Sequence, residues 1–503
     1  MPPTKIRLKL QRPLALLLTA VLFFLNTGCM VNKIRKLDVI QVPQPLQERL
    51  VGITTKAGQE VRFDAPGGTL TLEKIEGKVK GAPYTAAMQD VQRLWVERRG
   101  LSAVRTVGLV AGIVVVAFAT AVLAVLATKQ SCPFVYSWDG AQYVFDAEPY
   151  GGAITRGLER DDYSELENLR EHNGQYRLLL TNEVDETQFT NLMELWVVDH
   201  ARGLRVVSGE HGQLRGYRQM QEPIAARDRD GLDLLPWLRA TDRKIWEPEA
   251  VAGPNGNLRQ EVVLTFKKPA GARQVNLIAN AATGLWGSYM IKKMVELHGR
   301  ETAAWLASLD KNPAAVEAIH AWGEREGTYR LPIEVEEPQG WVVRGTLPNG
   351  GPLLAEDRVI ALDVSGVRGT ELRLRLRPPG GYWALNSFAA AYGPGEAVKI
   401  VRVPARSART SEGKDILADL AASDDRYYAM PDETHSAEVI FAAPPRTQQQ
   451  RTVLLHSRGW YQLHLRNNGA PDPATFTKIL TVPGAGVQFA ADRFAEWRRG
   501  VVP

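Results

Sequence analysis

One segment of 23 residues, Thr106 to Thr128, carries no charged side chain and is bracketed by Arg105 and Lys129. A helix of this length covers the roughly 30 Å hydrocarbon core of a bilayer. Gly108 and Gly112 form a G-x-x-x-G pattern on which two such helices can pack closely. Its many alanines, glycines and threonines make insertion only marginally favourable. The segment therefore predicts a transmembrane or membrane-associated helix over 106–128, with a helix or hairpin buried in a soluble protein core as the alternative.

A second apolar run opens the chain. Basic residues within 5–12 precede the 12 residues from Leu14 to Leu25, which is the pattern of an export signal rather than of a membrane span. The run ends in Asn26-Thr27-Gly28-Cys29. This ending resembles the bacterial lipobox, although Asn26 replaces the usual leucine. The resemblance implies a lipoprotein-type signal peptide over 1–28 and lipid attachment at Cys29; an uncleaved N-terminal anchor is the alternative.

The two apolar segments make opposing predictions about topology. If Cys29 lies outside the cytoplasm, a single crossing at 106–128 returns 129–503 to the cytoplasm. Arg98, Arg99 and Arg105 precede that segment and only Lys129 closely follows it, which favours a C-terminal body outside. A segment that associates with the membrane, or with copies of itself, without crossing reconciles the two. We expect a protein of the bacterial cell envelope with an extracytoplasmic body.

Composition narrows the class of protein and of partner. The 503 residues suffice for two to four domains, and 45% hydrophobic with 23% charged residues is typical of a folded chain. The net charge of +5 includes the four basic residues of the expected signal, which leaves +1 for the remainder. A nearly neutral body excludes nucleic acid as an expected partner. Cys132 has no cysteine to pair with if Cys29 is acylated, so the fold must rest on its core.

Turn and strand signals predict a mainly β fold. The runs 134–138 and 141–145 flank Asp139-Gly140, a strong hairpin signal because such turns need a positive φ. We expect small β-barrel and β-sandwich-like domains with an inserted αα-hairpin and one apolar membrane-type helix. The expected division of the folded chain is a β-rich domain at 30–100, a β-rich domain at 132–282, an αα-hairpin at 283–327 and a β-rich C-terminal domain at 328–503.

Three local patterns carry more specific predictions. Helical periodicity from Ile291 to Leu309, followed by Asn312-Pro313 at a helix start, predicts the two arms of the αα-hairpin. The runs 262–266 and 275–279 are expected to pair as neighbouring strands. The run 452–465 predicts a second hairpin with Arg458-Gly459 at its turn.

The stretch from Cys132 to Ile154, CPFVYSWDGAQYVFDAEPYGGAI, resembles a module of uncharacterised secreted bacterial proteins and lipoproteins. It shares their C-P-F/Y, W-D-G, aromatic strand and G-G pattern over about 25 residues. The resemblance implies an exported β-rich module and carries over no catalytic residue.

Acidic residues are dense between Asp146 and His200, and two kinds of site could use them. Asp161, Asp162, Glu183 and Asp185 could supply oxygen ligands to Ca²⁺, although no EF-hand spacing is present. Paired carboxylates among aromatic residues could also bind or hydrolyse a sugar. The alternative is a solvated acidic rim paired with neighbouring arginines. Apart from that Ca²⁺ hypothesis, no cofactor is expected.

The sequence predicts a non-enzymatic, membrane-tethered envelope lipoprotein that has a binding or structural role through its β-domains. Its expected partners are membrane lipid, through Cys29 and 106–128, and an envelope protein or surface polymer. An envelope hydrolase acting on carbohydrate is the alternative hypothesis.

Overall fold

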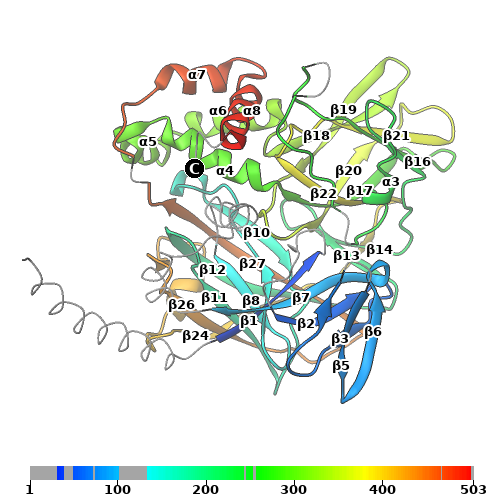
Figure 1. The fold of residues 1–503 in the computed structure, drawn as a ribbon, viewed down its shortest axis with the longest axis vertical. Coiled ribbons are helices and arrows are strands. Elements are labelled where there is room, and N and C mark those ends of the chain that lie inside the picture. Colours follow the sequence, from blue (N-terminus) through cyan, green and yellow to red (C-terminus); the bar gives the residue numbers. More distant parts are fainter. Residues whose placement is uncertain are drawn as a thin grey trace, which may run out of the picture.

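The protein is described here by a computed structural model, shown in Figure 1. The described residues are 31–38, 49–71, 74–100, 133–242, 245–252, 256–465 and 467–499. Strands make up 45% and helices 18% of the structure, so the prediction of a mainly β fold is confirmed. Cys29, Gly108, Gly112 and the apolar segment 106–128 lie outside the described residues. In the ranges given above, no helix has both the length and the apolar character needed to span a bilayer.

A nearly closed, barrel-like sheet lies at the centre of the molecule. Its strands are hydrogen-bonded in the order β9-β8-β11-β26-β24-β12-β27-β10, and β10 returns beside β9. Their bounds are β8 Phe134–Trp138, β9 Tyr143–Ala147, β10 Arg160–Glu165, β11 Gln175–Thr181, β12 Glu186–His200, β24 Val401–Thr410, β26 Ser436–Ala442 and β27 Gln450–Leu463, with β25 Tyr428–Met430 beside β12. Alternating residues such as Leu178, Leu195 and Val439 are fully buried in one apolar core, as expected for barrel strands.

A β-sandwich is inserted in the chain between β12 and β24. One sheet has the order β15-β16-β21-β18-β19 and the other the order β20-β17-β22. Their bounds are β15 Ala225–Arg227, β16 Val262–Lys267, β17 Gln274–Thr283, β18 Arg330–Glu337, β19 Gly340–Pro348, β20 Glu356–Asp363, β21 Glu371–Leu376 and β22 Trp383–Tyr392. Phe266, Leu277 and Phe388 are buried between the sheets. A small sheet of β13 Arg205–Ser208, β14 Leu214–Tyr217 and β23 Glu396–Ala397 links sandwich and barrel.

Helices cover one end of the barrel and sandwich (Figure 1). They are α4 Leu285–Glu296, α5 Thr302–Leu309 and α6 Pro313–Glu326, inserted between β17 and β18, and α7 Pro473–Thr481 and α8 Ala485–Arg498 after β27. The Asn312 side chain caps α6 by accepting a hydrogen bond from Ala315 N at 3.2 Å, so this predicted helix start is confirmed. The single helix expected over 291–309 is wrong. Helix α4 ends at Glu296, and the break before α5 contains Gly299 at a positive φ of 53°, where a Cβ would lie 2.4 Å from Gly469 O.

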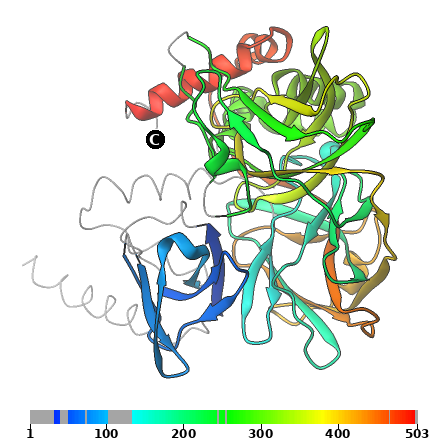
Figure 2. The ribbon, with the colours of Figure 1, turned by 90° about the vertical axis from the view of Figure 1, so that its right-hand side faces the viewer.

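The N-terminal unit is a small β-structure that continues the barrel sheet (Figure 2). Its strands are β1 Val31–Asp38, β2 Arg49–Thr55, β3 Glu60–Arg62, β4 Thr69–Leu70, β5 Lys74–Val79, β6 Ala82–Ala87 and β7 Val91–Gly100. Strand β1 pairs with β7 in an antiparallel manner and with β9 in a parallel manner, so the unit and the barrel share one sheet. The structure thus brings residues before and after 101–132 into a continuous hydrogen-bonded array.

Two strand predictions are wrong for identifiable reasons. Residues 450–463 form one continuous strand without a turn at Arg458-Gly459, because Gly459 pairs with β10 and β12 at once. A Cβ at Gly459 would lie 2.3 Å from Phe189 O and 2.8 Å from the Tyr150 ring, so this glycine serves close packing. Strands β16 and β17 belong to opposite sheets of the sandwich and do not pair.

The chain passes between the barrel sheet and the sandwich sheets within segments that the sequence predicts to be single domains. The expected segments 132–282 and 328–503 each contribute strands to both the barrel and the sandwich. The hairpin at Asp139-Gly140 is confirmed, with Trp138 opposite Tyr143 and Gly140 at a φ of 99°.

Candidate functional site

A cavity of about 780 Å³ lies where the barrel, the sandwich and the helices meet. Helices α4 to α7 supply most of the apolar lining, which includes Met294, Trp305, Trp322 and Phe476, and α6 adds the polar residues Glu317, His320 and Glu324. The Trp305 ring is stacked on His298 at a centroid distance of 3.9 Å and meets Phe476 edge-on at 5.4 Å. Cavities of this size at domain junctions, mostly apolar with a few polar groups, are the usual form of ligand sites.

The opposite wall is polar and comes from β10 and the neighbouring strands. Its charged residues include Arg160, Asp161, Asp162, Glu210, Arg330, Arg358 and Arg458. Most of these charges meet an opposite charge within the wall: Arg458 Nη1 lies 2.7 Å from Asp161 Oδ2, and Arg330 pairs with Glu210. The polar wall thus offers hydrogen-bonding groups without a large uncompensated charge.

Asp161 is held by a histidine as well as by Arg458. His456 Nε2 lies 2.8 Å from Asp161 Oδ1, and His456 Nδ1 lies 2.8 Å from Glu194 Oε1. The hydrogen bond from His456 is the largest cause that lowers the pKa of Asp161, and Arg458 adds to it against burial. Burial opposes the charged form of His456, but the two carboxylates outweigh it and raise the pKa of His456.

Asp162 follows Asp161 on β10 and has different partners. Its Oδ2 lies 3.0 Å from Arg160 Nη2 and accepts a hydrogen bond from Tyr150 N at 3.1 Å, and its Oδ1 lies 3.5 Å from Arg358 Nη2. Burial alone would raise the pKa of Asp162, but Arg160 and Arg358 overcome it and lower that pKa. Asp161 and Asp162 are therefore both held in the ionised form.

Glu183 and Asp185, the other two residues of the predicted site, lie elsewhere. Glu183 accepts a hydrogen bond from Tyr136 Oη at 2.7 Å, and Asp185 pairs with His464 at 2.8 Å on the surface. His464 directly follows the end of β27 at Leu463 and is six residues from Arg458, or about 20 Å at about 3.3 Å per residue. The structure therefore does not gather the four acids into one site. Within the ranges that the structure describes, no cluster of three or more His, Cys, Asp or Glu has the arrangement of a metal site, and Ca²⁺ stays a prediction.

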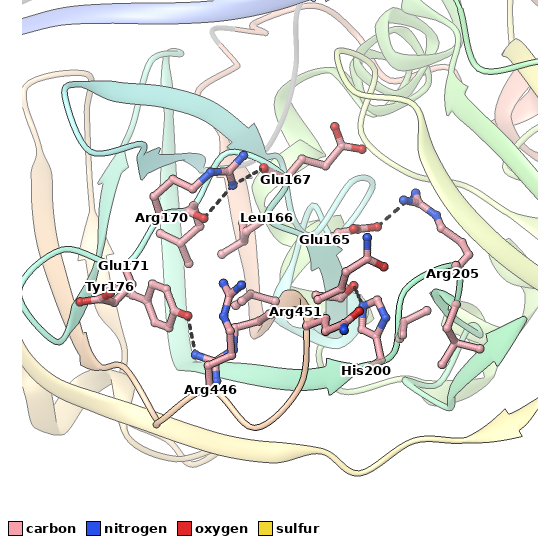
Figure 3. Close-up of a pocket in the computed structure, with 18 residues that line it drawn as sticks. Glu165, Leu166, Glu167, Arg170, Glu171, Tyr176, His200, Arg205, Arg446 and Arg451 are labelled. Atoms are coloured by element: carbon pink, nitrogen blue, oxygen red, sulfur yellow. Dashed lines mark hydrogen bonds and ion pairs between the residues drawn. The ribbon is translucent and has the colours of Figure 1, made fainter. Parts of the chain in front are cut away.

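A second hollow, a polar cleft of about 690 Å³, opens at the end of the barrel (Figure 3). Glu165 lies in its floor beside Arg205, and Arg170, His200 and Arg451 line its sides. Arg205 Nη2 lies 3.2 Å from Glu165 Oε2 and 2.8 Å from Asp357 Oδ2. Burial raises the pKa of Glu165 to about 8, although Arg205 acts in the opposite direction.

The sequence did not predict the partners that shift the pKa values of Asp161 and Glu165. His456 was placed on a hairpin, whereas β27 sets it between β10 and β12. Arg205 and Asp357 lie 152 residues apart in the chain and meet only because the sandwich folds back on the barrel. The density of charged residues in Arg160–Glu165 is the available signal, but it does not indicate which partner each side chain meets.

Comparisons with known proteins identify no family for this chain. No family model and no curated protein matches it. An α-xylosidase of the GH31 family from Xanthomonas citri is 8% identical with a TM-score of 0.16, over 78% of this chain and 34% of that one. A structure of infectious bursal disease virus Gt strain is 9% identical with a TM-score of 0.09, over 74% of this chain and 87% of that one. The chain spans about a third of the xylosidase, and likenesses this weak carry no argument about fold or function.

Proposed function

We propose that this protein is a non-enzymatic envelope lipoprotein, tethered to the membrane through Cys29 and 106–128, that binds a saccharide segment of a surface polymer in the cavity of about 780 Å³. The observation that carries the proposal is the contrast between the two walls of this cavity. The lining from α4, α5 and α7 is apolar and aromatic, whereas β10 and its neighbouring strands contribute charged groups, most of them paired, and α6 adds Glu317, His320 and Glu324. A sugar ring has an apolar face of C–H groups and a rim of hydroxyls, so it complements both walls at once.

The polar wall favours hydroxyl groups over a charged ligand. Asp161 and Asp162 are ionised and paired with guanidinium groups, which leaves lone pairs and N–H donors for further hydrogen bonds. A strongly charged ligand would have to compete with these pairs for its hydrogen-bonding partners. Neutral hydroxyls can bond to both members of a pair without displacing either.

The same carboxylates argue for binding rather than hydrolysis in this cavity. A glycosidase needs one carboxyl group that keeps its proton and donates it to the leaving group. The pKa values of both Asp161 and Asp162 are lowered, which is the wrong direction for that role.

Calorimetric titration of the full chain with a panel of oligosaccharides tests the proposal. Trp305→Ala should weaken binding about tenfold, equivalent to about 1.4 kcal/mol. Trp341→Ala is the matched control, because Trp341 lies over Arg375 on a face of the sandwich outside the cavity. Absence of binding across the panel, or equal losses in the two variants, would show that the proposal is wrong.

A carbohydrate hydrolase is the second candidate, and Glu165 is the observation that favours it. A carboxyl group with a pKa of about 8 in an open cleft can act as a general acid at neutral pH. The carboxylate of Asp357 shares Arg205 with it and is one candidate for a second acid. Release of reducing sugar by the wild-type chain, lost in Glu165→Gln, would favour this candidate over simple binding.

A further inference from the structure

The charges that line the large cavity are balanced everywhere except on helix α6. Among the described residues that line it away from α6, four carboxylates face four guanidinium groups: Glu159, Asp161, Asp162 and Glu210 against Arg160, Arg330, Arg358 and Arg458. Helix α6, which is described in full, adds the carboxylates of Glu317 and Glu324 and no lysine or arginine to this lining. His211 and His320 would cancel the excess of two negative charges only if both carried a proton.

Charges just behind the strand wall do not remove this excess. His456 is offset by Glu194, whose Oε1 lies 2.8 Å from His456 Nδ1. Arg358 also pairs with Glu356, which does not line the cavity, at 2.5 Å from Arg358 Nη2 to Glu356 Oε2. Because each of these basic groups has its own acidic partner, the negative excess at the cavity remains.

The excess is concentrated on one face of α6. Glu317, His320 and Glu324 are separated by three and four residues, which places them on the same side of the helix. Glu324 has partners, because its Oε2 lies 3.8 Å from Arg330 Nε and its Oε1 accepts a hydrogen bond from Thr346 Oγ1 at 3.2 Å. Glu317 is exposed, and in the part of the chain that the structure describes no basic side chain pairs with it. Its carboxylate is therefore available to a positive charge on a ligand.

Aromatic rings line the same cavity from the helices on either side of α6. Trp305 lies on α5 and Phe476 on α7, and both helices contact α6. A cation is attracted to the face of an aromatic ring as well as to a carboxylate. An organic ammonium group can use both features, whereas Ca²⁺ needs six to eight oxygen ligands and the described residues hold no cluster suited to a metal ion.

We propose that the saccharide bound in this cavity carries a free, protonated amino group, and that Glu317 is the residue that selects for it. The inference rests on the proposed function and names its ligand class, an amino sugar. The hydroxyls of such a sugar still meet the paired charges of the strand wall, because only the ammonium group turns towards α6. An N-acetylated sugar lacks this charge and gains nothing from Glu317.

Three tetrasaccharides with one β-1,4-linked backbone test this selection by calorimetric titration of the full chain. They are the tetramers of glucose, glucosamine and N-acetylglucosamine, which carry a hydroxyl, an amine and an acetamide at the same carbon. At pH 6.5 and low salt, the glucosamine tetramer should bind at least about fivefold more tightly than the glucose tetramer. Salt at about 1 M should reduce this ratio. The N-acetylglucosamine tetramer controls for the bulk of the substituent, and its affinity should not depend on salt.

Charge-removing variants locate the selection on α6. Glu317→Gln should lower the ratio of the two affinities about threefold. The double variant Glu317→Gln, Glu324→Gln leaves the carboxylates and guanidinium groups of the lining equal in number, so it should abolish the preference. Glu301 and Glu412 are exposed and do not line the cavity, so the double variant Glu301→Gln, Glu412→Gln removes the same charge elsewhere and should keep the preference.

The outcomes separate this inference from the proposed function. Equal affinity of the wild type for the glucose and glucosamine tetramers overturns the inference, while binding of the neutral tetramer still supports the proposed function. A preference that survives in Glu317→Gln, Glu324→Gln, or that both double variants lose equally, also overturns it. Binding of none of the three tetramers overturns the inference, and the full oligosaccharide panel then decides the proposed function. Thermal unfolding shows whether each variant is folded, and the single variant Glu317→Gln suffices if a double variant is not.

Discussion

His456 lies with its Nε2 atom 2.8 Å from Oδ1 of Asp161 and with its ring stacked on Tyr163 at a centroid distance of 4.6 Å. Its Nδ1 atom meets Glu194 at the same distance of 2.8 Å. An imidazole with a carboxylate at each nitrogen must donate at both, which requires the protonated form. The contact ties β27 to both of its neighbours and fixes Asp161, one of the carboxylates that line the large cavity.

Replacement of His456 by Gln should destabilise the protein by about 2 kcal/mol at pH 5.5, because two charge-assisted hydrogen bonds are lost. The pKa of His456 is raised above 6.5, so its contribution is complete below that pH and is lost as pH rises through the folded-state value. The pKa values of Asp161 and Glu194 are lowered, so the stability that these two carboxylates contribute is lost only as pH falls into the acid range. The stability difference between wild type and variant should therefore be smaller at pH 9 than at pH 5.5 in thermal unfolding.

His464 supplies the matched control. His464 Nδ1 also lies 2.8 Å from an aspartate, Asp185. The side chain of His464 is 37% exposed and that of Asp185 is 71% exposed, whereas the side chain of His456 is only 11% exposed. Solvent-exposed pairs contribute about 0–1 kcal/mol. His464→Gln should therefore change the melting temperature little at either pH. A variant of His456 that behaves like His464→Gln would show that the buried contact is unimportant.

The fold could be predicted from sequence where a local rule determines it. Asp139-Gly140 needs a positive φ, and Asn312-Pro313 caps a helix, and both features stand in the structure. Gly459 invited the same interpretation as a turn residue, but its backbone is extended within β27 and its missing Cβ makes room for Tyr150. A sequence alone does not distinguish a glycine needed for its φ from one needed for close packing.

The candidate site was less predictable because its parts come from distant strands. Asp161 and Asp162 were selected and do line the cavity, whereas Glu183 and Asp185 do not. Adjacent positions on a strand point to opposite faces, so Asp161 meets β27 while Asp162 meets Arg358 of the sandwich. Only the insertion of the sandwich between β12 and β24 determines that second partner.

Glu326 should be essential for docking of the C-terminal helices. Its side chain is 1% exposed, lies 2.6 Å from Arg259 Nη2, and accepts hydrogen bonds from Gly484 N at 3.0 and 3.1 Å. Glu326→Ala leaves a partly buried guanidinium without its partner, which should cost about 3–5 kcal/mol. Chemical denaturation measures this loss. Glu324→Ala, two residues away and 51% exposed, should cost less than about 1 kcal/mol.

Cysteine labelling should show that both sides of 101–132 face the same compartment. Lys78 and Glu171 are exposed, and they lie before and after that stretch. Lys78→Cys and Glu171→Cys are made separately in a Cys132→Ser background and treated with a membrane-impermeant maleimide. The two sites should react to the same extent as each other in intact cells, and again to the same extent once the outer membrane is opened. Reaction of one site only after the inner membrane is permeabilised would contradict the continuous sheet from β7 to β8.

Glu165 should make the protein less stable as pH rises through neutrality. Burial raises the pKa of Glu165 from 4.5 to about 8, so the native state binds this proton more tightly than the unfolded chain does. The stability that the neutral carboxyl contributes is complete below pH 4.5 and is lost as pH rises through about 8. Glu165→Gln stays neutral, so its melting temperature relative to wild type should increase between pH 5 and 9, by at least about 2 °C. Glu171 is an exposed residue of the same cleft, so the melting temperature of Glu171→Gln should change with pH as that of the wild type does. Parallel pH profiles for the wild type and both variants would show that Glu165 ionises normally.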